Sequence, residues 1–156
     1  EDSLNKRFVW NYYNRVRRSI RRLESTDSWS YSTATWRVAN NTTSNQINVV
    51  FGQAEDDIEL SVLAIAENTG TGAIMHVGIG EDSTTAPTVT APIGGQQISQ
   101  ANTAFTNSIT VSRIPLLGYH FYAWLERVTA SGTTTWYGDQ GAGSLYQTGI
   151  TGTIIN

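Results

Sequence analysis

The sequence predicts an all-β protein, an antiparallel jelly-roll β-sandwich, on three observations. The 156 residues include 21 Thr, 14 Ser, 14 Gly, five Trp and seven Tyr, a composition that suits strands and turns. Apolar and polar residues alternate with a period of two from residue 28 onward. About eight short strand patterns follow one another between turn signals, without a helical pattern between them, as in a double-sheet jelly roll.

The first strands are predicted from short alternating runs. Residues 27–37 indicate an opening strand or a pair of strands, and residues 47–51 indicate a short apolar strand. Residues 57–67 alternate most clearly, with Ile58, Leu60 and Val62 on one face. The opposite face is also apolar in its middle, so we expect this strand to be covered on both sides.

The later strands are separated by turns and one long irregular stretch at residues 83–103. A Gly-rich turn at 68–72 leads into a returning strand at 74–79. Tyr- and Trp-rich alternation makes 119–128 the strongest strand, and Ser131-Gly132 turns it into the next. The remaining predicted strands are 105–114, 133–137 and 145–155, the last preceded by a Gly-rich loop at 138–143.

The charge distribution divides the chain into a basic start and an acidic body. Residues 1–37 hold eight of the ten basic residues, although the net charge of the whole chain is −3. We therefore predict a basic arm or linker at 1–24, reaching upstream or neighbouring protein, and a sandwich domain at 25–156. Five arginines are the expected assembly contacts of this arm: Arg15, Arg17, Arg18, Arg21 and Arg22. The chain opens without a methionine, and we expect more protein upstream.

Residues 5–24 also allow a helical reading. Val9, Tyr13, Val16, Ile20 and Leu23 step by four and three, as in a coiled-coil seam. The seam would cover barely two heptads, and the helix would place like charges of neighbouring arginines over one another. We favour an extended arm and keep the helix as the alternative.

Charge and composition exclude several partners. The pI of about 5.3 argues against nucleic acid, because nucleic-acid-binding domains usually carry a basic face. No apolar run is long enough for a transmembrane helix, so no membrane insertion is expected. The chain has no cysteine, which rules out disulfides and thiolate metal sites.

No enzyme or metal chemistry is expected. The two histidines, His76 and His120, lie in different predicted strands, and we expect both to be structural. The acidic run at 55–59 lacks the spacing of a calcium loop, so we expect a solvated turn or a partner for the basic arm. We expect no cofactor.

The aromatic residues supply the best candidate for a binding site. Trp and Tyr rings stack on the apolar faces of sugars while polar neighbours hold the hydroxyl groups. Five such residues flank the Gly-rich loop and form our predicted ligand- or receptor-binding cluster: Trp136, Tyr137, Asp139, Gln140 and Tyr146. Because a strand alternates its faces, Trp136 and Tyr137 point to opposite sides, so at most one of them is expected to be exposed.

Several segments resemble virion structural proteins of tailed bacteriophages. They are FVWNYYNRV (8–16), TDSWSY (26–31), TWRVANN (35–41), GYHFYAWLE (118–126) and GTTTWYGD (132–139). The resemblance covers nearly the whole chain and implies a C-terminal β-rich domain of a longer virion protein, without a catalytic residue to carry over.

The resemblance implies a location in the virion and contacts with other virion proteins. The function we expect is host-surface binding by a trimeric tail fibre or spike tip, with a host cell-surface glycan as a partner. The alternative is a capsid decoration protein that stabilises the head, and a glycan-cleaving enzyme ranks last.

Overall fold

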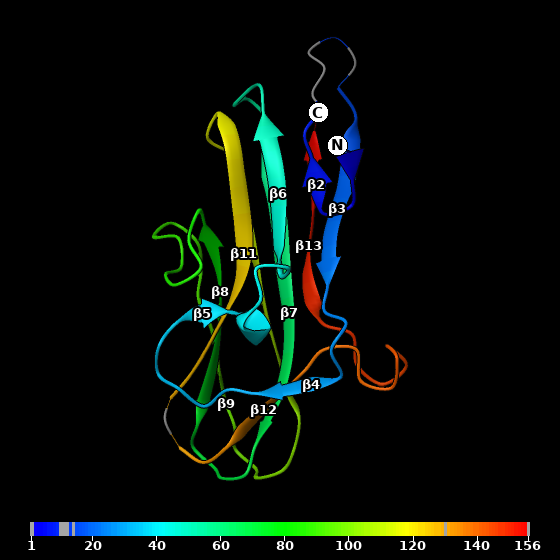
Figure 1. Cartoon of the computed structure of the whole chain (residues 1–156). Coiled ribbons are helices and arrows are strands. Elements are labelled where there is room, and N and C mark those ends of the chain that lie inside the picture. Colours follow the sequence, from blue (N-terminus) through cyan, green and yellow to red (C-terminus); the bar gives the residue numbers. More distant parts are fainter. Residues whose placement is uncertain (1, 10–12, 14, 130, 156) are drawn as a thin grey trace.

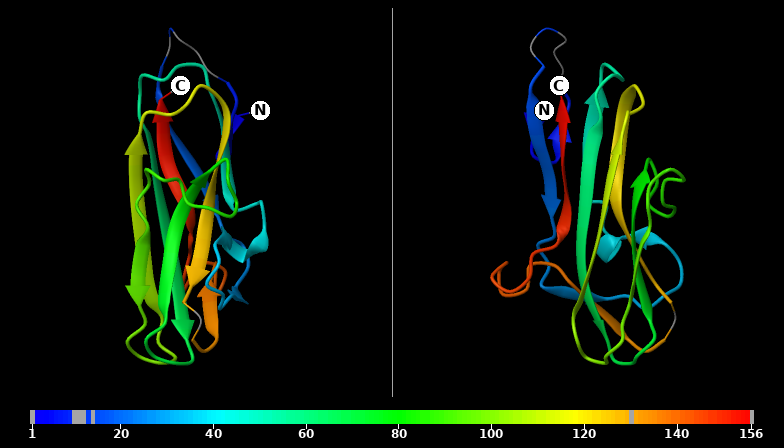
Figure 2. Two further views of the ribbon diagram at one scale, coloured as in Figure 1. Left: turned by 90° about the vertical axis from the view of Figure 1, so that its left-hand side faces the viewer. Right: turned by 180° about the vertical axis from the view of Figure 1, so that it is seen from behind.

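Two β-sheets pack face to face in the computed structural model of this chain, which describes residues 2–9, 13, 15–129 and 131–155 (Figure 1). Figure 2 shows the long strands running along a common axis, with loops gathered at both ends. The described residues contain no α-helix, and a single 3-10 turn, η1 (Ala39–Asn41), interrupts the strands. The predicted all-β sandwich is confirmed.

The first sheet follows the order β1-β2-β6-β11-β8-β9. Its strands are β1 (Asp2–Ser3), β2 (Lys6–Arg7), β6 (Gln46–Phe51), β11 (Gly118–Val128), β8 (Ile74–Glu81) and β9 (Gly94–Gln97). A short strand, β5 (Arg37–Val38), also pairs with β11. The pairs are antiparallel except for β2 and β6, which run parallel.

The second sheet is built around β7 (Ile58–Asn68). On one side β7 pairs with β10 (Phe105–Arg113), and on the other it pairs in succession with β13 (Gly149–Ile155) and β12 (Thr134–Tyr137). Two edge strands complete the sheet, β3 (Arg17–Leu23) beside β13 and β4 (Ser28–Ser30) beside β12. The long strands thus follow the orders β3-β13-β7-β10 and β6-β11-β8-β9, which is consistent with the predicted jelly roll.

The core lies between the sheets and follows the predicted alternation. Ile58, Leu60 and Val62 of β7 are fully buried against the opposite sheet. The other face of β7 is only partly covered, since Ile65 is 9% exposed but Leu63 is 40% exposed. The expectation that both faces of this strand are covered therefore holds for Ile65 alone.

The strand β9 lies inside the stretch predicted to be irregular. A Gly-Gly pair reads as a loop in the sequence, but here it pairs with β8, His76 facing Gly95. A Cβ atom on Gly94 would lie 2.7 Å from both Ile109 Cγ2 and Asn107 Oδ1. The residue is glycine because β10 passes too close for a side chain, which the sequence alone does not reveal.

Residues of the predicted arm contribute three strands to the sandwich. β1 and β2 form a hairpin on the edge of the first sheet, and β3 is an edge strand of the second. Ile20 is 1% exposed, so this part of β3 belongs to the core. Within residues 5–24, the regular secondary structure of the described residues consists of β-strands, as expected for the extended alternative and not for the helix. Val9 and Val16, two residues of the proposed helical seam, are exposed. Whether the segment also reaches neighbouring protein stays a prediction.

Candidate functional site

A polar groove of about 420 Å³ opens where the N-terminal hairpin, β6, β11 and β3 meet. Four separate segments of the chain line it. Its nine residues are Asn5, Lys6, Phe8, Arg22, Thr43, Ser44, Gln46, Asn48 and Tyr119. The volume is within the range of about 300–1,000 Å³ that small-ligand sites occupy.

Backbone pairing brings these segments together. Asn48 lies opposite Lys6 in the parallel pair of β2 and β6, and its N–H donates to the carbonyl of Asn5 at 2.9 Å. The N–H of Arg21 in β3 donates to the carbonyl of Leu4 at 2.6 Å. The hairpin therefore bonds to strands of both sheets and holds the wall of the groove in place.

Two aromatic rings form the apolar part of the groove. The ring of Phe8 meets the ring of Tyr119 edge to face, with centroids 6.0 Å apart. Tyr119 is 55% exposed, and its hydroxyl donates to Asn48 Oδ1 at 2.7 Å. Gln46 Nε2 donates to the same oxygen at 3.0 Å. A ring held in this way keeps an open face while losing little conformational freedom when a ligand binds.

The rest of the lining is polar, with two cations. The Nδ2 group of Asn48 donates to no atom of the described residues, and Thr43 and Ser44 are exposed hydroxyl residues. Lys6 and Arg22 carry the charges, and the nine lining residues include no Asp or Glu. The groove thus combines amide and hydroxyl hydrogen-bonding groups, aromatic faces and local positive charge.

The predicted binding loop lies elsewhere. Trp136 is fully buried and donates its indole N–H to the Tyr31 carbonyl at 3.1 Å, so its ring offers no face to a ligand. Tyr137 is half-buried and packs on Tyr146, with ring centroids 5.1 Å apart. Trp136 therefore lies in the core and Tyr137 lies nearer the surface, which agrees with the prediction that the two side chains point to opposite faces.

The backbone around Asp139 and Gln140 is ordered by internal hydrogen bonds. The N–H of Gly143 donates to the Asp139 carbonyl at 2.7 Å, and the N–H of Leu145 donates to the Gln140 carbonyl at 3.2 Å. Both side chains are half-buried, and neither lines the groove. A receptor-binding role for this loop stays a prediction.

Of the five arginines predicted as assembly contacts, Arg15 and Arg17 pair with the acidic run at 55–59. Arg15 forms ion pairs with Asp56 and, at 3.8 Å, with Glu55. Arg17 pairs with Glu59 at 3.0 Å. The acidic run at 55–59 was predicted to be either a solvated turn or a partner for the basic arm. These ion pairs show that it is a partner for the basic segment.

The other three arginines lie on β3 and differ in their surroundings. Arg18 and Arg21 are exposed, whereas Arg22 is half-buried and lines the groove. Exposed charges on an edge strand also hinder unwanted pairing with another sheet. An assembly role for these residues stays a prediction.

Among the described residues, no hydroxyl group forms a hydrogen bond with the ring of His76 or His120. His120 Nδ1 is 2.6 Å from Asp82 Oδ2, and its Nε2 is 3.1 Å from the Leu117 carbonyl. Burial by itself would lower the pKa of His120, but these two acceptors outweigh it and raise the pKa above its ordinary value. Burial and the nearby Arg127 lower the pKa of His76.

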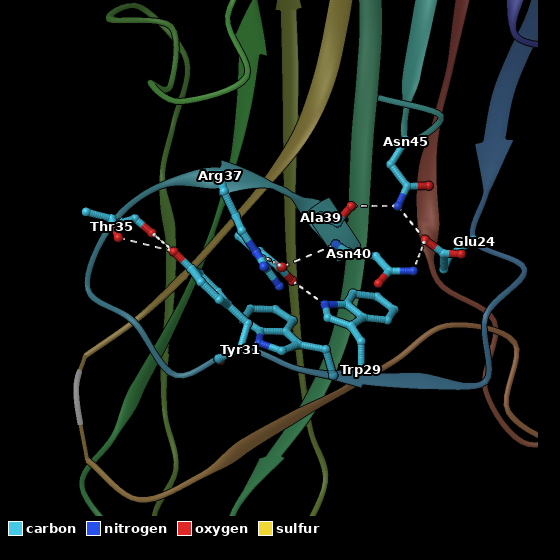
Figure 3. Close-up of polar contacts among 10 residues, drawn as sticks. Glu24, Trp29, Tyr31, Thr35, Arg37, Ala39, Asn40 and Asn45 are labelled. Carbon is cyan, nitrogen blue, oxygen red and sulfur yellow. Dashed lines mark hydrogen bonds and ion pairs between the residues drawn. The ribbon is translucent and has the colours of Figure 1, made fainter. Parts of the chain in front are cut away.

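A buried carboxylate, Glu126, joins the segment after β4 to the sheet. Its side chain is fully buried, and it accepts hydrogen bonds from Trp29 Nε1 and Arg37 Nε, both at 2.8 Å, and from the backbone N–H of Asn40 at 3.2 Å. Figure 3 shows Trp29, Arg37 and Asn40 converging on this point. Desolvation raises the pKa of Glu126 to about 7, although Arg37 and Trp29 act in the opposite direction.

A second buried carboxylate, Glu24, lies beside the first. The Nδ2 group of Asn45 donates to Glu24 Oε2 (Figure 3). The backbone N–H groups of Ser25 and Thr26 donate to Oε1 at 2.8 and 2.9 Å. Burial alone would raise the pKa of Glu24, but these hydrogen bonds outweigh it and lower the pKa. The two carboxylates are saturated with protein donors, so they act as a structural latch.

The Glu126 carboxyl group predicts a pH-dependent stability. Between its ordinary pKa of 4.5 and the folded value of about 7, the folded chain holds a proton that the unfolded chain releases. The free energy of unfolding should therefore fall as pH rises through this window, by at most about 1.4 kcal/mol per pH unit. Urea unfolding from pH 4.5 to 8 measures this slope.

The matched control is Glu126→Gln, in which the part of the slope that Glu126 contributes should be absent, so its stability should fall less with rising pH than that of the unchanged protein. The lowered pKa of Glu24 acts only below its ordinary value of 4.5. The contributions of His76 and His120, whose pKa values are lowered and raised from 6.5, are common to both proteins. Equal slopes in the two proteins would show that Glu126 does not titrate in this range.

The described residues contain no group of three or more His, Asp or Glu side chains placed to hold a metal ion. None of their helical segments has the length and apolar character to cross a membrane.

Comparisons with known proteins show similarity at the level of structure only. No protein-family model matches the sequence, and no curated protein matches it. Ten chains of solved structures match, among them one described as "EclA C-terminal domain; sugar-binding protein". That domain is 13% identical, covers 73% of this chain and 76% of its own, and aligns with a TM-score of 0.39. At this distance the similarity carries no argument about function.

The fold and the groove define a β-sandwich with a polar, aromatic-lined surface site, and sequence reasoning missed that site. Asn48 and Tyr119 are 71 positions apart in the chain and meet only through the pairing of β6 with β11. One signal was available: Asn48 interrupts an otherwise apolar strand, and a polar residue at such a position points to a local requirement.

Proposed function

We propose that this chain is a non-enzymatic binding module of a bacteriophage virion, and that the groove binds a glycan of the host cell surface. The observation that carries the binding role is the lining of the groove. The exposed face of Tyr119 can stack on the C–H face of a sugar ring, as aromatic rings with a polar handle do. Asn48 and the exposed Thr43 and Ser44 can hold the hydroxyl groups.

The virion location is supported by the resemblance of five sequence segments to virion structural proteins of tailed phages. A trimeric tail fibre or spike tip is the setting we propose, because such a domain meets the host surface first. A capsid decoration protein is the alternative. Gold-labelled antibodies against the domain, viewed by electron microscopy on particles that contain it, separate the two: label on tails supports the proposal, and label on heads only contradicts it.

Glycan cleavage ranks below glycan binding. Glycosidases place two carboxyl groups about 5–9.5 Å apart beside the bond they break. The nine residues that line the groove include no Asp or Glu, and the two buried carboxylates, Glu24 and Glu126, are bonded to protein donors.

The test of the binding role is Tyr119→Ala, measured on a glycan array with purified protein. Loss of the stacking ring should weaken glycan binding at least about tenfold, since aromatic contacts contribute on the order of 1 kcal/mol beyond the area they bury. The melting temperature should change little, because the ring is 55% exposed.

Tyr137→Ala is the matched control, since it removes a tyrosine from the loop that the sequence pointed to. Binding that is lost in Tyr137→Ala but kept in Tyr119→Ala would place the site at the loop. Binding that survives both changes, or no glycan binding by the unchanged protein, contradicts the proposed role of the groove.

A further inference from the structure

We infer that the groove selects an acidic sugar, one that bears a carboxylate or phosphate group, and that Arg22 pairs with this acid. The inference rests on the proposed glycan binding and adds the chemical class of the ligand. It follows from the surroundings of Arg22, from the charges of the lining, and from the division of the groove into aromatic and cationic parts.

Arg22 has no carboxylate partner among the described residues. Arg18, Arg21 and Arg127 share this lack, but Arg18 and Arg21 are exposed and Arg127 Nε donates to the Ala34 carbonyl at 3.1 Å. Five arginines pair with an Asp or Glu at 4 Å or less: Arg7, Arg15, Arg17, Arg37 and Arg113. The Nε atom of Arg22 is buried without a hydrogen-bond partner. The same atom is unpartnered in Arg7 and Arg15, but in each of these another nitrogen of the guanidinium group holds a carboxylate.

Strand geometry explains why Arg22 reaches the groove while its neighbour does not. In β3, Arg22 lies on the same face as the buried Ile20, whereas Arg21 lies on the opposite face. Arg22 is half-buried and lines the groove; Arg21 is exposed and does not. A partly buried guanidinium without a protein partner is costly, and an anionic ligand would complete its hydrogen bonds.

The charges of the lining favour an anion as well. Lys6 and Arg22 are the charged residues of the groove, and no carboxylate lines it, although the chain as a whole carries a net charge of −3. A local concentration of positive charge in a concave site attracts anions. The guanidinium group can donate two parallel hydrogen bonds to a carboxylate or phosphate, and a neutral hydroxyl group cannot accept such a pair.

The two parts of the groove then divide the ligand between them. Phe8 and Tyr119 face the sugar ring, while Lys6 and Arg22 face its acidic group. A neutral sugar uses only the first part and should bind more weakly.

Matched pairs of sugars test the inference by calorimetry or surface plasmon resonance. The pairs are galacturonate oligomers with galactose oligomers, sialyllactose with lactose, and mannose 6-phosphate with mannose; the first two carry a carboxylate and the third a phosphate. The unchanged protein should bind at least one acidic member about tenfold or more tightly than its neutral partner, and added salt should reduce the difference.

The variants are Arg22→Gln and its neighbour Arg21→Gln. Arg22→Gln should lose the preference for the acidic sugar and keep the weaker binding of the neutral one, and Arg21→Gln should keep both. Arg22→Lys, which keeps the charge but not the planar fork, should restore part of the preference. Circular dichroism verifies that each variant is folded; if Arg22→Gln is not, the Lys variant and the salt dependence of the unchanged protein decide.

The outcomes separate this inference from the proposed function. Equal binding of acidic and neutral sugars, still abolished by Tyr119→Ala, overturns the acidic preference and leaves the groove as a glycan site. A preference that persists in Arg22→Gln overturns the role of Arg22. Failure of every sugar to bind overturns the inference and the proposed function together.

Discussion

Replacing Glu126 with alanine should lower the free energy of unfolding by about 3–5 kcal/mol, the cost of breaking a buried ion pair by removing one partner. The carboxylate is fully buried and accepts three hydrogen bonds, from Trp29, Arg37 and Asn40. Its loss would leave all three donors unpartnered and a cavity between them. The segment that carries Trp29 and Arg37 is held to β11 by these contacts, so we expect it to loosen first.

Urea unfolding at pH 8, above the folded pKa of Glu126 of about 7, measures this loss, with the m-value as a check that the unfolded state is unchanged. Glu55→Ala is the control, because its carboxylate is 68% exposed and its ion pair with Arg15 spans 3.8 Å. Such a surface pair should contribute no more than about 1 kcal/mol. A loss below about 1 kcal/mol for Glu126→Ala would show that the latch does not hold this segment.

The double variant Glu126→Ala/Arg37→Leu isolates the charge. Removing both partners leaves no buried guanidinium without a counter-ion, so the double variant should be less destabilised than the sum of its two single changes. Strict additivity would mean that the energy of the latch comes from packing and not from the ion pair.

Replacing Trp136 with alanine should also lower the free energy of unfolding by about 3–5 kcal/mol, the usual effect of truncating a buried aromatic residue. Its ring is fully buried in the core between the sheets, and its indole N–H donates to the Tyr31 carbonyl. Thermal melting should show a decrease of several degrees or more. A change of less than about 1 kcal/mol would contradict the core role of Trp136.

Tyr137→Ala is the informative companion to this change. Its half-buried ring packs on Tyr146 and should contribute less to stability than Trp136. A cell-adsorption assay, read per folded molecule, tests the predicted binding role of the loop directly. If both variants melt lower and neither changes adsorption, the loop is structural and the binding surface lies elsewhere.

The strands were predictable because their signal is local. β7, β8, β10, β11 and β12 begin and end within two residues of the segments predicted from alternation. The misses occurred where a short-range pattern carries no information about distant neighbours. β9 begins with two glycines and reads as a loop, and the contact with β10 that explains one of them is made by residues more than ten positions away.

The N-terminal segment shows the same limit. Its arginines suggested an arm separate from the domain, because nothing in residues 1–24 reveals that β13 offers an open edge. In the structure that edge pairs with β3 along its whole length, from Arg17 beside Ile155 to Leu23 beside Gly149. The core position of Ile20 follows from this pairing and not from the composition of the segment.

The sequence by itself determined the all-β class, the position of most long strands and the opposite orientation of Trp136 and Tyr137, because a period of two is a property of consecutive residues. Only the tertiary structure brought together the residues of the groove that we propose as the ligand site. Asn5, Arg22, Asn48 and Tyr119 become neighbours through pairing between strands and between sheets, so no window of the sequence contains the groove. The tertiary structure also showed that Arg22 is half-buried whereas Arg21 is exposed, because the burial of a residue in an edge strand depends on the elements that pack beside it.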